Sequence, residues 1–160
     1  IQMGTLSKAV GAFGAYVCGS RKLIDFLVNC SRSFIYSTAL PPAIAAAARQ
    51  GLDIIESDPA RRERLWENTR FLLSGLRDLG LDTRQSATPI IPVVVGDNVR
   101  AVEFSKRLLA SGIYAAAIRP PTVPANSARL RISVMATHTR QDLEFLLSQT
   151  QRIKAELCPG

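Results

Sequence analysis

Hydrophobic residues recur every three or four positions over a long stretch in the middle of the chain. The stretch follows Asp58-Pro59, a pair that favours a helix start, and Gly80 comes directly after its last leucine. This spacing places the apolar side chains on one face of a helix. We therefore expect a helix between these points, with a core-facing stripe made of Leu65, Thr69, Leu72, Leu73, Leu76 and Leu79.

After this helix the pattern changes to short apolar runs separated by turns. Thr139 and Asp142 have the spacing of a capping box, which marks the start of a last helix. We expect, in chain order, a strand at 90–95, a turn at 96–98, a helix at 99–111, strands at 113–118 and 129–134, and a helix ending near 156. Strand, helix, two strands and helix predict a small α/β domain over residues 57–160.

The first part of the chain predicts shorter elements. Residues 15–18 predict a buried strand, and Ser20 is expected to cap a helix over 21–29. Residues 31–40 are expected to be irregular, and Pro41-Pro42 to open an Ala-rich helix to about residue 56. We expect residues 1–56 to be the end of a larger domain and its connecting helix.

Charge and cysteine content exclude several classes of protein. The net charge is +7, but the basic residues are scattered without interleaved aromatics, which favours an anionic substrate or cofactor over nucleic acid. Cys18, Cys30 and Cys158 are odd in number and lack CxxC spacing, so we expect reduced, partly buried thiols and no metal site. No apolar run is long enough to span a bilayer and no signal peptide is visible, so we expect a soluble, cytoplasmic protein.

Lys8 stands out among the lysines because it is surrounded by small residues in a glycine-rich segment just before a predicted strand. Most lysines are solvated surface charges. In a tight turn the amine would have little room for solvation, which would favour its neutral form, a nucleophile toward a carbonyl. Lys8 is therefore a candidate for covalent chemistry.

Three segments, in order along the chain, resemble the α-oxoamine synthases, which are pyridoxal-phosphate (PLP) enzymes of fold type I. Residues 4–16 (GTLSKAVGAFGAY) resemble the cofactor-lysine segment, and residues 35–42 (IYSTALPP) resemble the next fixed segment. Residues 118–131 (IRPPTVPANSARLR) resemble the C-terminal one. The resemblance implies an α/β chain that combines the end of the PLP-binding large domain with a small C-terminal domain.

The resemblance also implies roles for residues around the cofactor. Lys8 would bond PLP and later remove the α-proton of the amino acid, and Thr5 would bind the cofactor phosphate. Ser37 and Thr38 match positions that reach the phosphate from the neighbouring subunit. A homodimer with its active site at the interface is therefore expected.

An amino-acid carboxylate needs a fixed cation, and arginine can bind it through two parallel hydrogen bonds. Arg129 and Arg131 are two apart on a predicted strand and should project to the same face, although an edge strand with solvated charges gives the same pattern. The spacing does not choose between them. The family's carboxylate-binding arginine matches Arg131, with Arg129 in reserve. Arg119 is expected to shape the substrate pocket or to meet a carboxylate on the acyl chain.

Residues 96–98 and 117–124 most resemble the biotin-pathway member of the family. That member joins L-alanine to a pimeloyl thioester, carried by coenzyme A or a carrier protein, with loss of carbon dioxide. Two alternatives remain open: another α-oxoamine synthase, such as 5-aminolevulinate synthase or 2-amino-3-ketobutyrate ligase, and a non-catalytic, dimerising piece. Because the chain opens inside the lysine motif, we expect a fragment that lacks the family's upstream cofactor-ring partners and is inactive alone.

Overall fold

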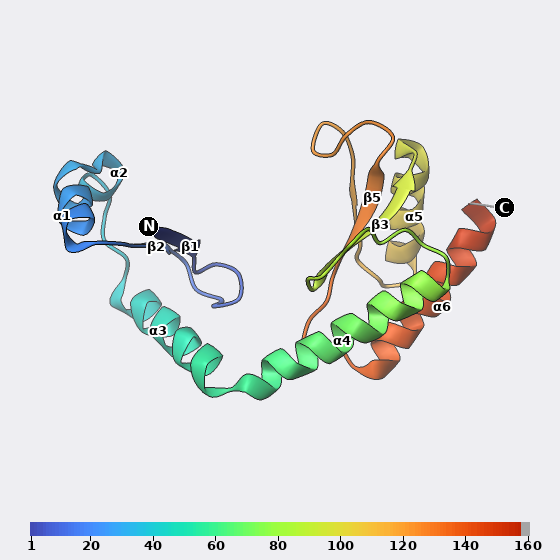
Figure 1. Cartoon of the computed structure of the whole chain (residues 1–160), viewed down its shortest axis with the longest axis horizontal. Helices are drawn as coiled ribbons and strands as arrows, with labels where there is room; N and C mark the ends of the chain where they lie inside the picture. The colour runs from blue at the N-terminus through green and yellow to red at the C-terminus, as the bar shows by residue number, and fades with distance from the viewer. Residues whose placement is uncertain (158–160) are drawn as a thin grey trace. The chain divides into compact units, whose positions relative to one another are not determined.

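The computed structural model describes residues 1–157 (Figure 1), and Cys158 lies outside the described residues. Internal contacts divide the chain into two compact units, Ile1–Pro59 and Ala60–Gly160. The first unit contains a two-stranded sheet and three helices, and the second contains a three-stranded sheet and its helices. Each unit has its own hydrophobic cluster.

The first unit begins with an antiparallel hairpin. Strand β1 (Gln2–Thr5) pairs with β2 (Ala15–Cys18), and Thr5 lies opposite Ala15. Helix α1 (Arg21–Cys30) follows, and the Ser20 hydroxyl accepts a hydrogen bond from the amide of Leu23, as expected of an N-cap. Strand β2 and helix α1 confirm the elements predicted for residues 15–30, whereas β1 was not predicted. The expectation that the strand at 15–18 is buried is wrong, because all four of its residues are exposed.

Two further helices complete the unit. The short helix α2 (Arg32–Ile35) lies in a segment expected to be irregular, so that prediction is wrong over these residues. The amides of Phe34 and Ile35 both donate to the carbonyl of Ser31, which closes a single helical turn. Helix α3 (Pro42–Ser57) starts at the predicted proline pair, because a proline at the first helical position gives up no hydrogen bond.

The second unit packs its helices on an antiparallel sheet. Its elements are α4 (Pro59–Asp78), β3 (Ile90–Gly96), α5 (Asn98–Ala110), β4 (Ala116–Ile118), β5 (Ala128–Ser133) and α6 (Arg140–Leu157). The strand order is β3-β5-β4, so β5 is the central strand. The predicted order of strand, helix, two strands and helix is confirmed.

Strand β5 has one buried and one outer face. Ala128, Leu130 and Ile132 are buried, whereas Arg129 and Arg131 point to the opposite side. The buried side chains join those of α4, α5 and α6 in one core, whose largest fully buried members are Phe104, Leu72, Leu76, Ile91, Leu108, Leu130 and Ile153. The leucine stripe predicted for α4 contributes to this core.

Strand β4 is shorter than predicted, because the residues before it serve helix α5. The amide of Ile113 donates to the carbonyl of Leu108 and completes the turn that ends α5. The Ser105 hydroxyl donates to the carbonyl of Ala115 over 2.6 Å. Ile113 and Ala115 therefore use backbone groups in hydrogen bonds to α5, and pairing with β5 starts only at Ala116.

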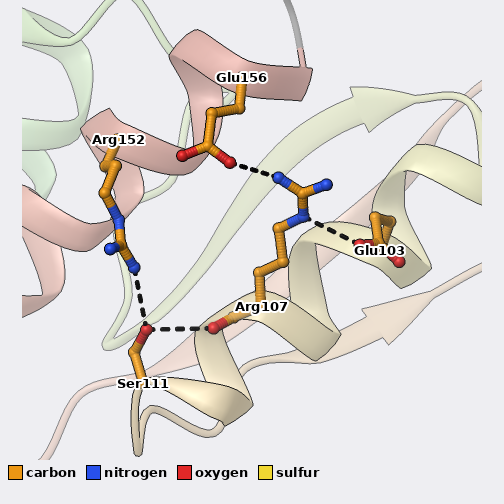
Figure 2. A network of polar contacts seen from close by, with 5 residues as sticks. All are labelled: Glu103, Arg107, Ser111, Arg152 and Glu156. Atoms are coloured by element: carbon orange, nitrogen blue, oxygen red, sulfur yellow. Dashed lines mark hydrogen bonds and ion pairs between the residues drawn. The ribbon is translucent and has the colours of Figure 1, made fainter.

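A polar network joins α5 to α6 (Figure 2). The Arg107 guanidinium donates to Glu103 one turn earlier on α5 and to Glu156 on α6. Ser111 donates to the carbonyl of Arg107, and its oxygen accepts from Arg152 of α6. Both carboxylates stabilise the charged guanidinium and raise the pKa of Arg107, with the hydrogen bond to Glu103 as the largest cause.

Cys18 and Cys30 are free thiols. Both are exposed, so the expectation of partly buried side chains is wrong for these two residues. Cys18 ends strand β2 and Cys30 ends helix α1, and neither position faces the small core of the first unit. Among residues 1–157, no helix is both long and apolar enough to cross a bilayer.

Candidate active site

The predicted site residues fall in two groups, one in each unit. Lys8, Thr5, Ser37 and Thr38 belong to the first unit, and the three arginines belong to the second.

The loop that carries Lys8 joins the two strands of the hairpin and is closed by its own backbone. The amide of Leu6 donates to the carbonyl of Gly14, and the amide of Ala12 donates to the carbonyl of Leu6, both over 2.9 Å. The amide of Gly11 donates to the carbonyl of Lys8 itself and closes a turn that Gly11 completes with a φ of 67°. The backbone of Lys8 is therefore fixed within a closed loop.

Helix α3 supports this loop from one side. Leu6 and Ala12 of the loop are buried against Ala48 of α3, and Val10 packs on the same cluster. A Cβ atom added to Gly51 would lie 2.8 Å from the carbonyl oxygen of Val10, which shows how closely the helix approaches the loop backbone. The lysine therefore stands on a loop that is packed on its apolar side.

The Lys8 amine itself is exposed and bonds to a second predicted site residue. Nζ donates to Thr5 Oγ1 over 2.9 Å. The structure therefore brings Lys8 and Thr5 together, but the expectation that the amine has little room for solvation is wrong for this chain. The small residues around Lys8 shape its backbone, while the side chain extends away from the cluster of Leu6, Ala12 and Ala48.

Ser37 and Thr38 follow helix α2 and are exposed. The structure gives neither of them a contact with Lys8 among the described residues. The next residues do approach the lysine loop, because Leu40 Cδ1 lies 3.1 Å from the position of a Cβ added to Gly14. The family-derived role of Ser37 and Thr38 in binding phosphate across subunits thus stays a prediction.

Arg129 and Arg131 lie on the same face of β5, as expected from their spacing. Arg129 is opposite Val94 of β3 and Ile118 of β4, and Arg131 is opposite Pro92 and Ala116. The alternative interpretation of an edge strand is wrong, because β5 has a partner on both sides. The two guanidinium groups stand on a sheet face whose neighbouring side chains are apolar.

The two arginines differ in what their side chains bind. Arg129 is half-buried, and its Nε donates to the carbonyl of Ser127 over 3.0 Å. Arg131 is exposed, and among residues 1–157 its guanidinium has no hydrogen bond or ion pair. Arg131 is therefore the more exposed of the two and has no bond to give up when it binds a ligand.

A cavity of about 830 Å³ lies beside Arg131. It is lined by residues 112–116, which lead into β4, by the end of β5 and the segment after it, and by α6. Its wall combines apolar side chains with polar groups. Arg129 and Arg119 do not line it. The polar and aromatic lining residues include Tyr114, Arg131, Ser133, His138, Asp142 and Phe145.

Two polar residues of this wall have structural partners. His138 Nδ1 accepts a hydrogen bond from the amide of Met135 over 3.2 Å, within the segment that leads into α6. The Asp142 carboxylate accepts from the amide and the hydroxyl of Thr139, and the Thr139 hydroxyl accepts in return from the amide of Asp142. This is the predicted capping box, and the hydrogen bond from the Thr139 amide is the largest cause that lowers the pKa of Asp142.

Arg119 is exposed at the start of a proline loop, residues 119–127, that links β4 to β5. The three prolines of this loop do not keep it extended. The amide of Thr122 donates to the carbonyl of Arg119, and the Ser127 hydroxyl donates to the carbonyl of Pro124. These bonds fold the loop back on itself, and Ser127, whose importance was not predicted, is buried at its end.

Sequence comparison now places the chain in a family. The family model of aminotransferase class I and II matches residues 1–149. The chain belongs to this family. The lysine loop and the β4–β5 region, including all the candidate residues above, lie within the matched part of this aminotransferase-family chain.

Individual curated proteins are similar to nearly the whole chain. An 8-amino-7-oxononanoate synthase from Symbiobacterium thermophilum is 48% identical over 157 residues, and one from Geobacter sulfurreducens is 47% identical over 159 residues. Each alignment covers 98% of this chain. The chain spans about 40% of the length of these curated relatives.

Solved structures of related enzymes have the same fold. The serine palmitoyltransferase of Sphingomonas wittichii superposes with a TM-score of 0.90 at 31% identity, covering 97% of this chain and 39% of that enzyme. The 8-amino-7-oxononanoate synthase of Francisella tularensis superposes with a TM-score of 0.84 at 28% identity, covering 96% and 45%. The predicted fold class, an α/β chain of PLP fold type I, is confirmed.

Proposed function

We propose that this chain carries the cofactor lysine and the substrate carboxylate site of an 8-amino-7-oxononanoate synthase. This PLP-dependent acyltransferase would join L-alanine to a pimeloyl thioester and release carbon dioxide and the thiol. The observation that carries the proposal is the Lys8–Thr5 pair on its closed loop, within a chain 48% identical to a protein of that name. The first unit would then be the end of the PLP-binding domain.

The residues around Lys8 fit the cofactor chemically. PLP is an aldehyde with a phosphate group, and it needs a reachable primary amine and hydrogen-bond donors. The Lys8 amine is exposed, and the Thr5 hydroxyl is adjacent at 2.9 Å and can donate to a phosphate oxygen. The closed loop keeps both groups in place before any ligand arrives, which reduces the entropy lost on binding.

When bound, PLP supplies the electron sink that stabilises a carbanion at the α-carbon of the amino acid. The chain's own contribution begins with Lys8. Its Nζ would bond the cofactor, be released when the substrate amine takes its place, and then remove the α-proton as a neutral amine. The hydrogen bond to Thr5 would orient Nζ, since it leaves the nitrogen lone pair of a neutral amine free.

Arg131 would bind the carboxylate of L-alanine. It has an unengaged guanidinium beside the cavity, whereas Arg129 is held by the carbonyl of Ser127. Two parallel hydrogen bonds from one guanidinium fix both oxygens of a carboxylate and therefore orient the α-carbon. The apolar neighbours Pro92 and Ala116 reduce competition by water for this ion pair.

Three further residues, Ser37, Thr38 and Arg119, would complete the site in a homodimer. Ser37 and Thr38 are exposed and could donate hydrogen bonds to the phosphate of a neighbouring subunit's cofactor. Arg119, exposed in the proline loop, would meet the terminal carboxylate of the pimeloyl chain. The acyl donor could be carried by coenzyme A or by a carrier protein.

The proposal is tested on the complete gene product with PLP, L-alanine and pimeloyl-CoA. We expect a visible absorbance band of bound PLP, and borohydride reduction should leave the cofactor's mass on the peptide that contains Lys8. Lys8→Ala should remove both this label and turnover, whereas Lys22→Ala, at an exposed lysine on α1, should keep both. Full turnover by Lys8→Ala would contradict the proposal.

Substrate choice separates the proposed activity from related ones. L-alanine and glycine are assayed against pimeloyl-CoA, succinyl-CoA and acetyl-CoA. Activity with glycine and succinyl-CoA alone would replace the proposal with 5-aminolevulinate synthesis, and glycine with acetyl-CoA alone would indicate 2-amino-3-ketobutyrate synthesis. No turnover with any pair, together with a stable dimer, would favour a non-catalytic, dimerising protein.

A further inference from the structure

Arg129 occupies the base of the proline loop, where the chain leaves the sheet and returns to it. Its backbone is in register with Ile118, the residue directly before Arg119. Its side chain binds the carbonyl of Ser127, the last residue of the loop, with Nε and O 3.0 Å apart. Arg129 thus pairs with the residue that precedes the loop and bonds to the last residue of the loop.

Hydrogen bonds near both ends of the proline loop hold its shape. Ser127 is only 8% exposed, and its hydroxyl donates to the carbonyl of Pro124 over 2.6 Å. At the other end, the amide of Thr122 donates to the carbonyl of Arg119 over 3.1 Å. Three prolines leave the loop few other amides with which to hold itself. A group that fixes Ser127 therefore acts on one of the two hydrogen bonds that shape the loop, and the other begins at Arg119.

The Arg129 side chain is suited to a supporting role. It is half-buried, and its stem is flanked by Val94 and Ile118 on the two neighbouring strands. It does not line the cavity beside Arg131. Its hydrogen bond from a charged donor to a carbonyl is stronger than a neutral one.

We propose that Arg129 is a positioning residue, which fixes the proline loop through Ser127 and so places Arg119 for the terminal carboxylate of the acyl donor. This inference rests on the proposed function and deepens it, because it assigns the two strand arginines different tasks. Arg131 binds the amino acid, and Arg129 acts on the acyl donor through the loop.

The test compares Arg129→Met, which keeps an apolar stem without the donor, with Arg129→Lys, which restores a cationic donor. The KM for pimeloyl-CoA should rise about tenfold in Arg129→Met, as expected for one lost hydrogen bond of this strength. The KM for L-alanine should change little, and Arg129→Lys should recover much of the loss. The control Arg100→Met, at an exposed arginine on α5, should match the wild type.

A substrate without the terminal carboxylate isolates the effect. Heptanoyl-CoA has the same chain length as pimeloyl-CoA but offers no carboxylate to Arg119. The KM penalty of Arg129→Met should therefore disappear with heptanoyl-CoA. An equal penalty with both substrates would overturn the inference, since it would indicate a general effect on the site.

Hydrogen exchange gives a second measurement that needs neither cofactor nor substrate. The amides of residues 119–127 should exchange faster in Arg129→Met than in the wild type or in Arg131→Met. Unchanged exchange in Arg129→Met would refute the positioning role even if the enzyme has the proposed activity. If exchange is faster in Arg129→Met but the wild-type protein has no synthase activity, the contact between Arg129 and the loop is supported and the proposed function is rejected.

Discussion

Thr5 and Lys8 are joined by a hydrogen bond of 2.9 Å from the lysine amine to the threonine hydroxyl. The two residues come from different parts of the hairpin, since Thr5 ends strand β1 and Lys8 lies in the loop. The strand therefore sets the position of the hydroxyl, and the closed loop sets that of the amine. This pair is the most direct structural support for a cofactor site in the chain.

Removing the Thr5 hydroxyl should weaken PLP binding without removing the lysine. We expect Thr5→Val, which keeps the shape of the side chain, to raise the PLP dissociation constant about tenfold through the loss of one hydrogen bond to a charged group. Titration of the visible absorbance of bound PLP measures this change. Thr5→Ser keeps the hydroxyl and should bind like the wild type; a loss as large as that of Thr5→Val would argue against the phosphate contact.

Arg131→Lys should lower kcat/KM for L-alanine by at least about tenfold. A lysine keeps the charge but cannot form two parallel hydrogen bonds to one carboxylate. Steady-state kinetics at a fixed concentration of acyl thioester measure the effect, which should appear mainly in the KM for alanine. Arg100→Lys, on the surface of α5, is the matched control. If Arg131→Lys had the kinetics of the wild type, another residue would have to bind the carboxylate of alanine.

The capping box at the start of α6 should make stability depend on pH in acid. The folded state lowers the pKa of Asp142 below the ordinary 3.8, so the unfolded chain takes up this proton more readily. The contribution is therefore complete above the unfolded pKa and is lost as the pH falls through the lower folded value. Thermal unfolding of Asp142→Asn should show less loss of stability in that acidic window than the wild type does. Identical acid profiles would contradict this assignment.

The network of Figure 2 should contribute a stabilisation that depends on salt. Arg107→Met removes the cation that links Glu103 on α5 to Glu156 on α6, and we expect a lower melting temperature. These groups are partly exposed. Because 1 M salt reduces the Debye length to about 3 Å, the difference from the wild type should shrink there. Arg100→Met is the control for charge. A difference that stays constant with salt would point to lost packing of the side chain.

Local signals in the sequence predicted most of the second unit. Thr139 and Asp142 form the predicted capping box at the start of α6. Asp97, expected only in a turn, also caps α5 by accepting from the amide of Arg100. Such caps involve residues three apart, so their partners are visible in the sequence itself. The alternation along β5 likewise predicted that Arg129 and Arg131 share a face.

The errors come from contacts between distant residues. The start of β4 depends on the hydrogen bond from Ser105 to Ala115, ten residues apart, and β1 exists because it can pair with β2. The partner of Arg129, the carbonyl of Ser127, depends on how the proline loop folds back. The environment of Lys8 was misjudged because small neighbours define the course of a backbone without defining what covers a side chain.

The central position of β5 has a practical consequence for protein engineering. Its inward residues hold the core of the second unit, whereas the outward positions facing Arg129 and Arg131 are Pro92, Val94, Ala116 and Ile118 on the two flanking strands. A mutant library restricted to these four outward positions would vary the surroundings of both guanidinium groups and leave the packed side of the sheet intact. Selectivity for the amino acid could then be screened with little loss of folded protein.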